Sequence, residues 1–250
     1  MRHYGLIGQS LQHSFSQRYF TRKFAQENLS DCQYRLYELP DITQFKEFLQ
    51  CHQDLLGLNV TIPYKQQIIP LLDDIDAEAE RIGAINTVRI FRDGHSVRTV
   101  GYNTDVDGFR LSLAGHPLTD KALVLGTGGA SAAVIYVLQD WGVACRQVSR
   151  TKNREWLCYS DLTPSIIAEN RMIVNCTPLG MFPNVNTKPD IPYEALTEQH
   201  FLYDLVYNPE ETLFLREGRL RGAQIQNGYK MLALQAEASW KIWNASQRQI

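Results

Sequence analysis

The sequence predicts an α/β protein with two domains, each built on a mainly parallel sheet. Short apolar segments of strand length alternate with amphipathic helical segments along nearly the whole chain, which is typical of parallel strands joined by crossover helices. A second series of such segments begins near Lys121, and the break before it places a domain boundary around residues 103–120. The chain has 250 residues, of which 44% are hydrophobic, enough to bury two small cores.

The first series of segments is expected to form three strands, two helices and a hairpin. The expected elements are strands at residues 3–8, 33–38 and 56–60 and helices at residues 16–27 and 42–49. Two further strands, residues 84–91 and 97–102, flank Arg92-Asp93-Gly94-His95. Asp-Gly between two segments of this kind is a strong signal for a tight β-hairpin.

The second series predicts a parallel sheet followed by a long helix. The expected strands are residues 122–125, 144–149, 172–175, 201–205 and 223–226, with a further strand within residues 158–162. Helices are expected at residues 132–138 and 230–244.

Composition excludes several classes of function. The net charge is -2, with 25 basic and 27 acidic residues, so neither a nucleic-acid surface nor a polybasic membrane surface is expected. No apolar run approaches the roughly 20 residues that cross a bilayer, and the apolar start of the chain is too short for a signal peptide, so a cytoplasmic location is expected. The five cysteines lack a C-x-x-C spacing and the six histidines lack paired spacings, which predicts reduced thiols and no metal centre.

A glycine-rich turn follows the first strand of the second series. Its residues are Gly126, Thr127, Gly128, Gly129 and Ala130, and a helix is expected directly after them. Glycine permits a tight turn and a close approach to phosphate, and the helix N-terminus supplies free N–H groups. A tight strand–helix turn alone would also select glycine, but the strand–loop–helix context favours a dinucleotide site.

The end of the next strand indicates which dinucleotide binds. An NAD site usually has an acidic residue about 20 positions after the glycines, to hold the ribose hydroxyl. Here the strand ends in Ser149-Arg150-Thr151, with no acidic residue at that place. Arg150 can pair with a 2′-phosphate and stack on adenine, so NADP is favoured over NAD. The alternative is an ordinary solvated basic turn.

Polar residues gather at the ends of strands in the first series. Asn59 and Thr61 share one face of a strand, and Lys65 begins the helix after it. Asn86 and Asp105 follow in two later polar segments. Taken singly, Lys65 fits an ordinary surface lysine, Asn86 a turn residue and Asp105 a helix N-cap.

Taken together, these segments resemble the shikimate dehydrogenase family, in the family's order from residue 4 to about residue 240. The matching segments are Gly5-Leu6-Ile7-Gly8, Ser14-Phe15-Ser16, Asn59-Val60-Thr61-Ile62-Pro63-Tyr64-Lys65, Gly83-Ala84-Ile85-Asn86-Thr87, Asn103-Thr104-Asp105, Asn175-Cys176-Thr177-Pro178-Leu179-Gly180-Met181 and Asn227-Gly228-Tyr229-Lys230-Met231-Leu232. Several independent matches in one order make the resemblance specific.

The resemblance implies an enzyme that reduces 3-dehydroshikimate reversibly to shikimate with NADPH, in the biosynthesis of chorismate and the aromatic amino acids. It implies a substrate-binding domain of residues 1–104 plus 227–250, to which the C-terminal helix returns. A Rossmann-like NADP-binding domain, residues 105–226, is inserted between these parts. A monomer or a homodimer is expected, with small molecules as its partners.

The resemblance also implies a role for each site residue. Lys65 and Asp105 are implied as the catalytic pair. The implied substrate-binding residues are Ser14 and Ser16 at the carboxylate, Asn59, Thr61, Asn86, Asp105 and Gln235 at the ring hydroxyls, and Tyr207 as a further contact. Besides the glycine turn and the 149–151 segment, the implied cofactor neighbours are Thr177, Leu179, Met181, Leu205 and Gly228. Chemistry agrees, because hydroxyls and amides both donate and accept hydrogen bonds, and an ammonium can stabilise charge on a carbonyl oxygen and protonate it.

The chain departs from the family pattern at four places. Gln17 replaces a proline, Thr127 replaces an alanine of the glycine turn, and Ser149 replaces an asparagine. Only 23 residues separate Thr151 from Asn175, which leaves little room for a full helix after Thr151 and predicts a trimmed adenosine side. Three alternatives stay open: a quinate/shikimate dehydrogenase that uses NAD, a non-catalytic binding module on the same fold, and a folate-linked dehydrogenase of similar layout.

Overall fold

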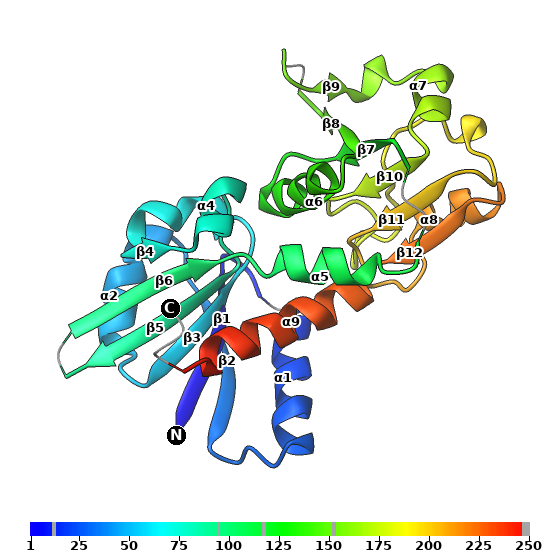
Figure 1. Cartoon of the computed structure of the whole chain (residues 1–250). Helices are drawn as coiled ribbons and strands as arrows, with labels where there is room; N and C mark the ends of the chain where they lie inside the picture. Colours follow the sequence, from blue (N-terminus) through cyan, green and yellow to red (C-terminus); the bar gives the residue numbers. More distant parts are fainter. Residues whose placement is uncertain (12–13, 95, 117–118, 152–153, 247–250) are drawn as a thin grey trace. The chain divides into compact units, whose positions relative to one another are not determined.

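The chain divides into two compact units, each with its own sheet (Figure 1). The computed structural model describes residues 1–11, 14–94, 96–116, 119–151 and 154–246. Unit 1 comprises Met1–Asp107 and Gln235–Ile250, and unit 2 comprises Gly108–Leu234. Both boundaries fall inside helices, α5 (Asp105–Ser112) and α9 (Tyr229–Asn244).

Unit 1 contains a six-stranded mixed sheet in the order β2-β1-β3-β5-β6-β4. Its strands are β1 (Arg2–Gly8), β2 (Cys32–Glu38), β3 (Leu55–Val60), β4 (Asp74–Ile75), β5 (Thr87–Asp93) and β6 (Ser96–Tyr102). Strand β1 is parallel to β2 and β3, whereas β5 is antiparallel to both β3 and β6. The predicted hairpin is the cause of the antiparallel part: Asp93 pairs with Ser96, and Gly94 takes the left-handed φ of 58° that such a turn needs. His95 lies outside the described residues.

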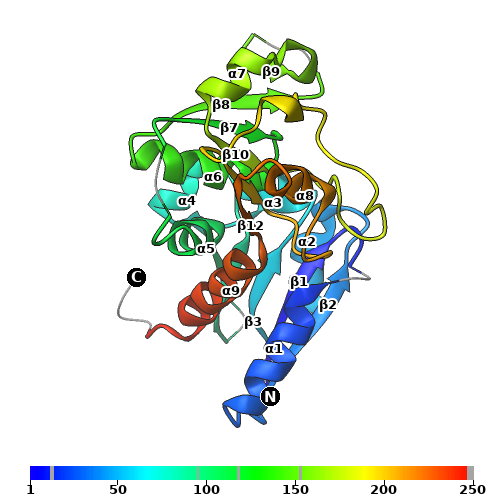
Figure 2. The same cartoon turned by 90° about the vertical axis from the view of Figure 1, so that its right-hand side faces the viewer.

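One face of this sheet is covered by α1 (Phe15–Gln26) and by α9 (Figure 2). Trp243 of α9 stacks on Tyr4 of β1 with ring centroids 5.0 Å apart, and its indole N–H donates to the carbonyl oxygen of Val88 at 3.1 Å. A Cβ on Gly57 would lie 2.3 Å from the indole ring, so only glycine leaves room for this packing. These contacts confirm that the C-terminal helix returns to the first sheet.

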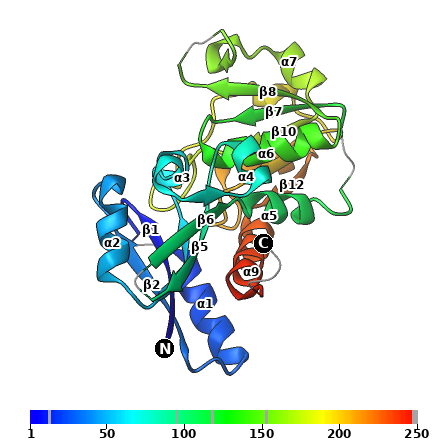
Figure 3. The same ribbon diagram turned by 60° about the vertical axis from the view of Figure 1, so that its left-hand side comes forward.

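The other face of the unit 1 sheet packs against shorter helices (Figure 3). These are η1 (Ile42–Gln44), α2 (Phe45–Cys51), α3 (Tyr64–Gln67), η2 (Ile69–Leu71) and α4 (Ala77–Ile82). The helix expected at residues 42–49 is a 3₁₀ turn that continues as α2. The Asp41 side chain accepts the Thr43 N–H at 2.9 Å, so Asp41 is the N-cap residue of this 3₁₀ turn.

Unit 2 contains a six-stranded sheet in the order β12-β11-β10-β7-β8-β9, and every pairing in it is parallel. Its strands are β7 (Lys121–Leu125), β8 (Ala144–Ser149), β9 (Leu157–Cys158), β10 (Met172–Asn175), β11 (Phe201–Asp204) and β12 (Gln224–Asn227). This is the strand order of a dinucleotide-binding sheet. The order reverses between β7 and β10, so ligands are expected beyond the carboxyl ends of those two strands.

Helices cover both faces of the unit 2 sheet. They are α5, α6 (Gly129–Asp140), α7 (Pro164–Glu169) and α8 (Leu213–Arg219), with the 3₁₀ turns η3 (Tyr159–Asp161) and η4 (Tyr193–Ala195). The strand expected within residues 158–162 is wrong beyond Cys158, because the chain turns into η3 there. Among the described residues from Thr151 to Trp156 there is no helix, as the short spacing predicted.

Within the part of the chain that the structure describes, no helix is both long and apolar enough to cross a membrane.

Candidate active site

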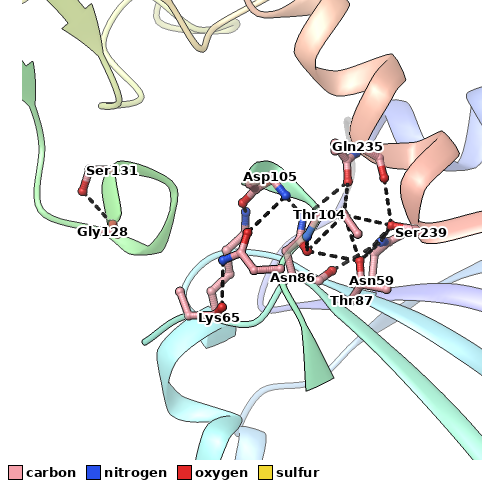
Figure 4. A network of polar contacts seen from close by, with 12 residues as sticks. Asn59, Lys65, Asn86, Thr87, Thr104, Asp105, Gly128, Ser131, Gln235 and Ser239 are labelled. Atoms are coloured by element: carbon pink, nitrogen blue, oxygen red, sulfur yellow. Dashed lines mark hydrogen bonds and ion pairs between the residues drawn. The ribbon is translucent and has the colours of Figure 1, made fainter. Parts of the chain in front are cut away.

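A lysine and an aspartate form a close ion pair at the carboxyl end of the unit 1 sheet (Figure 4). Lys65 Nζ donates to Asp105 Oδ2 at 2.5 Å, and the two side chains are 16% and 8% exposed. The short helix α3 that carries Lys65 is fixed by its neighbour, because the Tyr64 hydroxyl donates to the Leu39 carbonyl oxygen at 2.6 Å. Asp105 begins α5, and its N–H donates to Asn103 Oδ1 at 3.1 Å. The pair can therefore hold an ammonium at a fixed, nearly buried position.

Asn86 links this pair to the rest of unit 1. Its Nδ2 donates to Asp105 Oδ1 at 2.9 Å, so both oxygens of Asp105 have a partner. Its Oδ1 accepts the Thr104 N–H at 2.7 Å and faces the Thr104 and Thr87 hydroxyls, each at 3.1 Å. Gln235 Oε1 lies 3.4 Å from both Asn86 Nδ2 and Thr104 Oγ1. Asn86, Asp105 and Gln235 are thus brought together from separate segments, as a shared site requires.

Asn59 is buried beneath these groups with its amide largely engaged. Its Oδ1 accepts the Tyr34 hydroxyl at 2.8 Å. Its Nδ2 lies within hydrogen-bond distance of Ser239 Oγ (2.9 Å), Thr87 Oγ1 (3.2 Å) and the Asn86 carbonyl oxygen (3.3 Å). Both amide hydrogens therefore have protein acceptors, and one lone pair of Oδ1 is left for a ligand.

Two serines mark the N-terminal end of α1. Ser14 is the N-cap residue, yet its hydroxyl makes no cap bond. The Ser14 Oγ is buried, and no group among the described residues hydrogen-bonds to it. Ser16 lies in the first turn and is buried. The Ser16 side chain hydrogen-bonds to Tyr34. A free hydroxyl such as that of Ser14, at a helix N-terminus, fits an anionic ligand such as a carboxylate.

The remaining substrate candidates fall in different units. Thr61 directly follows β3 and is half-buried, with its N–H donating to the Ile7 carbonyl oxygen at 3.0 Å. Tyr207 belongs to unit 2, where it lies in the loop after β11. It is also half-buried.

The glycine turn of unit 2 follows β7, where the strand order reverses. Gly126 has a φ of 117°, which L side chains rarely adopt, and its carbonyl oxygen accepts a hydrogen bond from Gln147 Nε2 at 2.9 Å. Gly128 is the N-cap residue of α6, and a Cβ built there would meet nothing within 4 Å. The open space in front of the free N–H groups of α6 fits the pyrophosphate of a dinucleotide. Thr127, Gly129 and Ala130 complete this turn.

The expected adenosine side lies at the end of β8. The Thr151 N–H donates to Ser149 Oγ at 3.2 Å, which closes a tight turn around Arg150. Arg150 is exposed, so its guanidinium is accessible to a phosphate. Arg154 is exposed too, whereas Lys152 lies outside the described residues.

A buried aspartate, Asp204, joins the loops after β10 and β11 through hydrogen bonds. The sequence analysis did not identify it. Asp204 accepts hydrogen bonds from Asn175 Nδ2 (2.9 Å), the Val206 N–H (3.0 Å) and the Thr212 hydroxyl (2.6 Å). Burial raises the pKa of Asp204 to about 7. Asn175 Oδ1 in turn accepts the Thr177 hydroxyl at 2.6 Å. An aspartate ending the apolar strand Phe201–Asp204 was the signal that could have found it.

These fastened loops carry the remaining cofactor candidates. The candidates are Thr177, Leu179 and Met181 after β10, and Leu205 after β11. Met181 is 43% exposed, which is unusual for a large apolar side chain and fits contact with a ligand. Gly228 touches the same loop, because a Cβ built on it would lie 2.1 Å from the Leu205 carbonyl oxygen.

The fold and the site define a class. A parallel sheet in the dinucleotide-binding order, with a glycine turn at its switch point, accompanies a lysine–carboxylate pair set among amides and hydroxyls. This combination is that of a nucleotide-cofactor oxidoreductase acting on a small polar substrate. No group of three potential metal ligands lies together within the described ranges.

Comparison with known proteins identifies the family. The family model of the shikimate dehydrogenase substrate binding domain matches residues 6–88. The shikimate dehydrogenase (NADP(+)) of Caldicellulosiruptor saccharolyticus is 36% identical over 95% of this chain and 90% of its own. The crystal structure of shikimate 5-dehydrogenase from Thermus thermophilus, in complex with NADP(H) and shikimate, has a TM-score of 0.85 and 31% identity, and the match covers 98% and 94% of the two chains.

A quinate dehydrogenase is also similar. The structure of quinate dehydrogenase from Corynebacterium glutamicum in complex with NAD has a TM-score of 0.84 and 27% identity, over 98% of this chain and 94% of that one.

The chain belongs to the shikimate dehydrogenase family. This confirms the resemblance drawn from the sequence.

Proposed function

We propose that this protein is an NADP-dependent shikimate dehydrogenase, which reduces 3-dehydroshikimate reversibly to shikimate. The observation that carries the proposal is the Lys65–Asp105 pair, 2.5 Å apart and nearly buried, among hydroxyl and amide groups suited to a polyhydroxylated ring. Full-length relatives that bear the name shikimate dehydrogenase (NADP(+)) support the same activity, the same cofactor and a place in aromatic amino acid biosynthesis.

Unit 1 binds the substrate in this proposal. The substrate carboxylate accepts hydrogen bonds from Ser14 and Ser16 at the N-terminus of α1, where the helix dipole favours negative charge. The ring hydroxyls bond to Thr61, Asn86, Asp105 and Gln235, with Asn59 beneath them. Tyr207 is assigned as a further substrate contact. A substrate that lacks a hydroxyl would leave buried polar groups unpaired and would be rejected.

Lys65 supplies the proton. When bound, NADPH supplies the hydride that reduces the carbonyl carbon. As negative charge grows on the carbonyl oxygen, the Lys65 ammonium stabilises that charge and donates its proton to the oxygen. Asp105 holds the ammonium in place through Oδ2 and accepts a substrate hydroxyl. In the reverse direction the neutral amine accepts the proton from the hydroxyl of shikimate.

Unit 2 binds the cofactor. The N–H groups of the Gly126–Ala130 turn and of α6 bind the pyrophosphate, and Arg150 pairs with the 2′-phosphate, with Ser149 and Thr151 beside it. The nicotinamide contacts the loops fastened by Asp204. The residues assigned to these contacts are Thr177, Leu179, Met181, Leu205 and Gly228. The functional domains are assigned as residues 1–104 plus 227–250 for the substrate and 105–226 for the cofactor, in a cytoplasmic monomer or homodimer.

A quinate/shikimate dehydrogenase that uses NAD is the second candidate. The likeness to the Corynebacterium glutamicum quinate dehydrogenase in complex with NAD favours it. The exposed Arg150, with no acidic residue at the ribose position, favours NADP instead. Initial rates with shikimate or quinate, each with NADP or NAD, separate the two, and a higher catalytic efficiency with quinate and NAD would reject the first proposal.

The catalytic pair is tested by substitution. Lys65→Ala should lower kcat by about 10²–10⁴-fold, the usual contribution of a general acid. Asp105→Asn should lower it similarly, and the double variant should fall well short of the product of the two effects because the residues act as a unit. Lys23 provides a matched control: its Nζ pairs with Glu237 at 2.8 Å in unit 1 and its side chain is 10% exposed. Lys23→Met should affect stability more than turnover; near-native turnover of Lys65→Ala would remove Lys65 from the mechanism.

A further inference from the structure

Three buried hydroxyls meet behind the proposed catalytic pair. They belong to Thr87 at the start of β5, Thr104 just before α5, and Ser239 in α9, and all three residues are fully buried. Thr87 Oγ1 lies 2.8 Å from Ser239 Oγ and 3.1 Å from Thr104 Oγ1, and Thr104 Oγ1 lies 3.1 Å from Ser239 Oγ (Figure 4). We call these three residues the hydroxyl cluster. Thr87 directly follows Asn86 in the chain, and Thr104 directly precedes Asp105. The hydroxyl cluster therefore lies next to the proposed site.

The hydrogens of the cluster can be counted. The Ser239 hydroxyl donates its single hydrogen to the Gln235 carbonyl oxygen, one helical turn back, at 3.0 Å. Ser239 Oγ is then left to accept, and Asn59 Nδ2 donates to it at 2.9 Å. The Thr87 and Thr104 hydroxyls each have two acceptors within reach: Ser239 Oγ, at 2.8 and 3.1 Å, and Asn86 Oδ1, which lies 3.1 Å from each. The cluster therefore places two hydroxyl donors within reach of one side of the Asn86 amide.

These hydroxyls, together with a backbone N–H, fix which way the Asn86 amide points. The Thr104 N–H, at 2.7 Å, also requires an acceptor at the same place. A flipped amide would set its NH₂ group against these donors and turn its oxygen toward Asp105 Oδ1, which would repel it. Asn86 must therefore present its N–H groups to Asp105 and Gln235. Asp105 in turn keeps Oδ2 for Lys65.

We propose that Thr87, Thr104 and Ser239 are positioning residues that lock the Asn86 amide, and through it Asp105 and Lys65, in the orientation that binds and protonates the substrate. The proposal rests on the proposed function, because the locked groups are those assigned to the ring and to the proton. Its consequence is a fixed polarity: Asn86 donates and Asp105 accepts, so a substrate hydroxyl that contacts both must accept from Asn86 and donate to Asp105. Each hydroxyl of the cluster acts without touching the substrate.

Paired substitutions separate this polar role from simple packing. Thr87→Val keeps the shape of the side chain but removes the hydroxyl, whereas Thr87→Ser keeps the hydroxyl and removes a methyl group. If the hydroxyl positions Asn86, Thr87→Val should lose about tenfold in kcat/KM for shikimate, the loss expected for one or two hydrogen bonds, while Thr87→Ser stays within about threefold of wild type. A packing role gives the opposite order.

Ser239→Ala is the smallest change and should also lose about tenfold in kcat/KM for shikimate. The KM for NADP should stay unchanged in every cluster variant, because the cluster belongs to unit 1. Ser112 supplies a matched control: it is fully buried at the end of α5, two turns after Asp105. Its hydroxyl contacts the Phe109 carbonyl oxygen and the Tyr203 hydroxyl, each at 2.8 Å, and neither of these belongs to the proposed site. Ser112→Ala should keep kcat/KM for shikimate near that of wild type.

The outcomes are decisive in either direction. The expected pattern is a loss in Thr87→Val and Ser239→Ala, near-native activity in Thr87→Ser and Ser112→Ala, and native NADP affinity by calorimetry throughout. If Thr87→Val fails to fold, Ser239→Ala against Ser112→Ala decides alone. Native kcat/KM in Ser239→Ala, or a greater loss in Thr87→Ser than in Thr87→Val, would overturn the positioning role. A wild type that oxidises no shikimate would overturn the proposed function itself, which is a separate result.

Discussion

Asp204 should make the stability of this protein depend on pH in an unusual direction. The carboxylate is fully buried in unit 2, and its hydrogen-bond donors are the uncharged groups of Asn175, Val206 and Thr212. Burial raises its pKa from 3.8 to about 7, and the hydrogen bonds from Thr212, Val206 and Asn175 offset only part of that rise. The folded protein therefore holds a proton that the unfolded chain has released.

The sign and size follow from this shift. Between pH 3.8 and about 7 the folded state binds more protons at Asp204 than the unfolded state does, so the free energy of unfolding falls as pH rises through this window. Each pKa unit corresponds to about 1.4 kcal/mol. As pH rises from about 5 to about 8, the titration of Asp204 should therefore lower the free energy of unfolding by roughly 2.5 kcal/mol.

Asp204→Asn removes this titration while leaving an oxygen to accept the Val206 N–H. Urea unfolding of wild type and Asp204→Asn, measured across that pH range, gives the difference between their free energies of unfolding, in which the other carboxylates cancel. That difference should move in favour of Asp204→Asn by about 2.5 kcal/mol as pH rises. Thr212→Val removes a donor that favours the carboxylate and should steepen the dependence. A difference that stays flat, or that moves in favour of wild type, would refute the reasoning.

Three further predictions concern the proposed ligand contacts. Gly228→Ala places a Cβ about 2.1 Å from the Leu205 carbonyl oxygen, so it should lower stability by about 1–3 kcal/mol and weaken NADP binding at least tenfold; unchanged calorimetric affinity would contradict this. Arg150→Ala should reduce the NADP/NAD affinity ratio about tenfold or more, and an unchanged ratio would place the 2′-phosphate elsewhere. Ser14→Ala should mainly raise the KM for shikimate and leave kcat near native, since the carboxylate contact is present in ground and transition states alike; native shikimate affinity would move the carboxylate to another site.

The sheets were the most predictable part of the structure. Strand β10 is an unbroken apolar segment, Met172–Asn175, and all four of its residues are buried between helices, as a central parallel strand requires. The two-residue strand β4 was not predicted, because Asp74 and Ile75 form a strand only by pairing with β6. Helix α4 was missed for a similar reason: six residues with three charges carry almost no apolar periodicity.

The residues of the proposed site were predictable from the sequence, but the hydrogen-bond network that connects them was not. The polar segments after β3 and β6 could be read from the sequence because each follows an expected strand. Ser239 gave no such signal, since its partners Thr87 and Thr104 lie 152 and 135 positions away in the chain. Local periodicity cannot place residues so far apart next to each other; only the return of α9 to the first sheet does so.

That return has a consequence for synthesis on the ribosome. Unit 1 contains residues from both sides of unit 2, so a growing chain finishes the whole of Gly108–Leu234 before Gln235 and Ser239 exist. Domains generally fold as they emerge, which lets unit 2 fold while the first sheet still lacks one of its covering helices. The face that later receives Trp243 stays open to water, or to a chaperone, for that interval. Unit 2 thus precedes unit 1 in time, although it follows most of unit 1 in sequence.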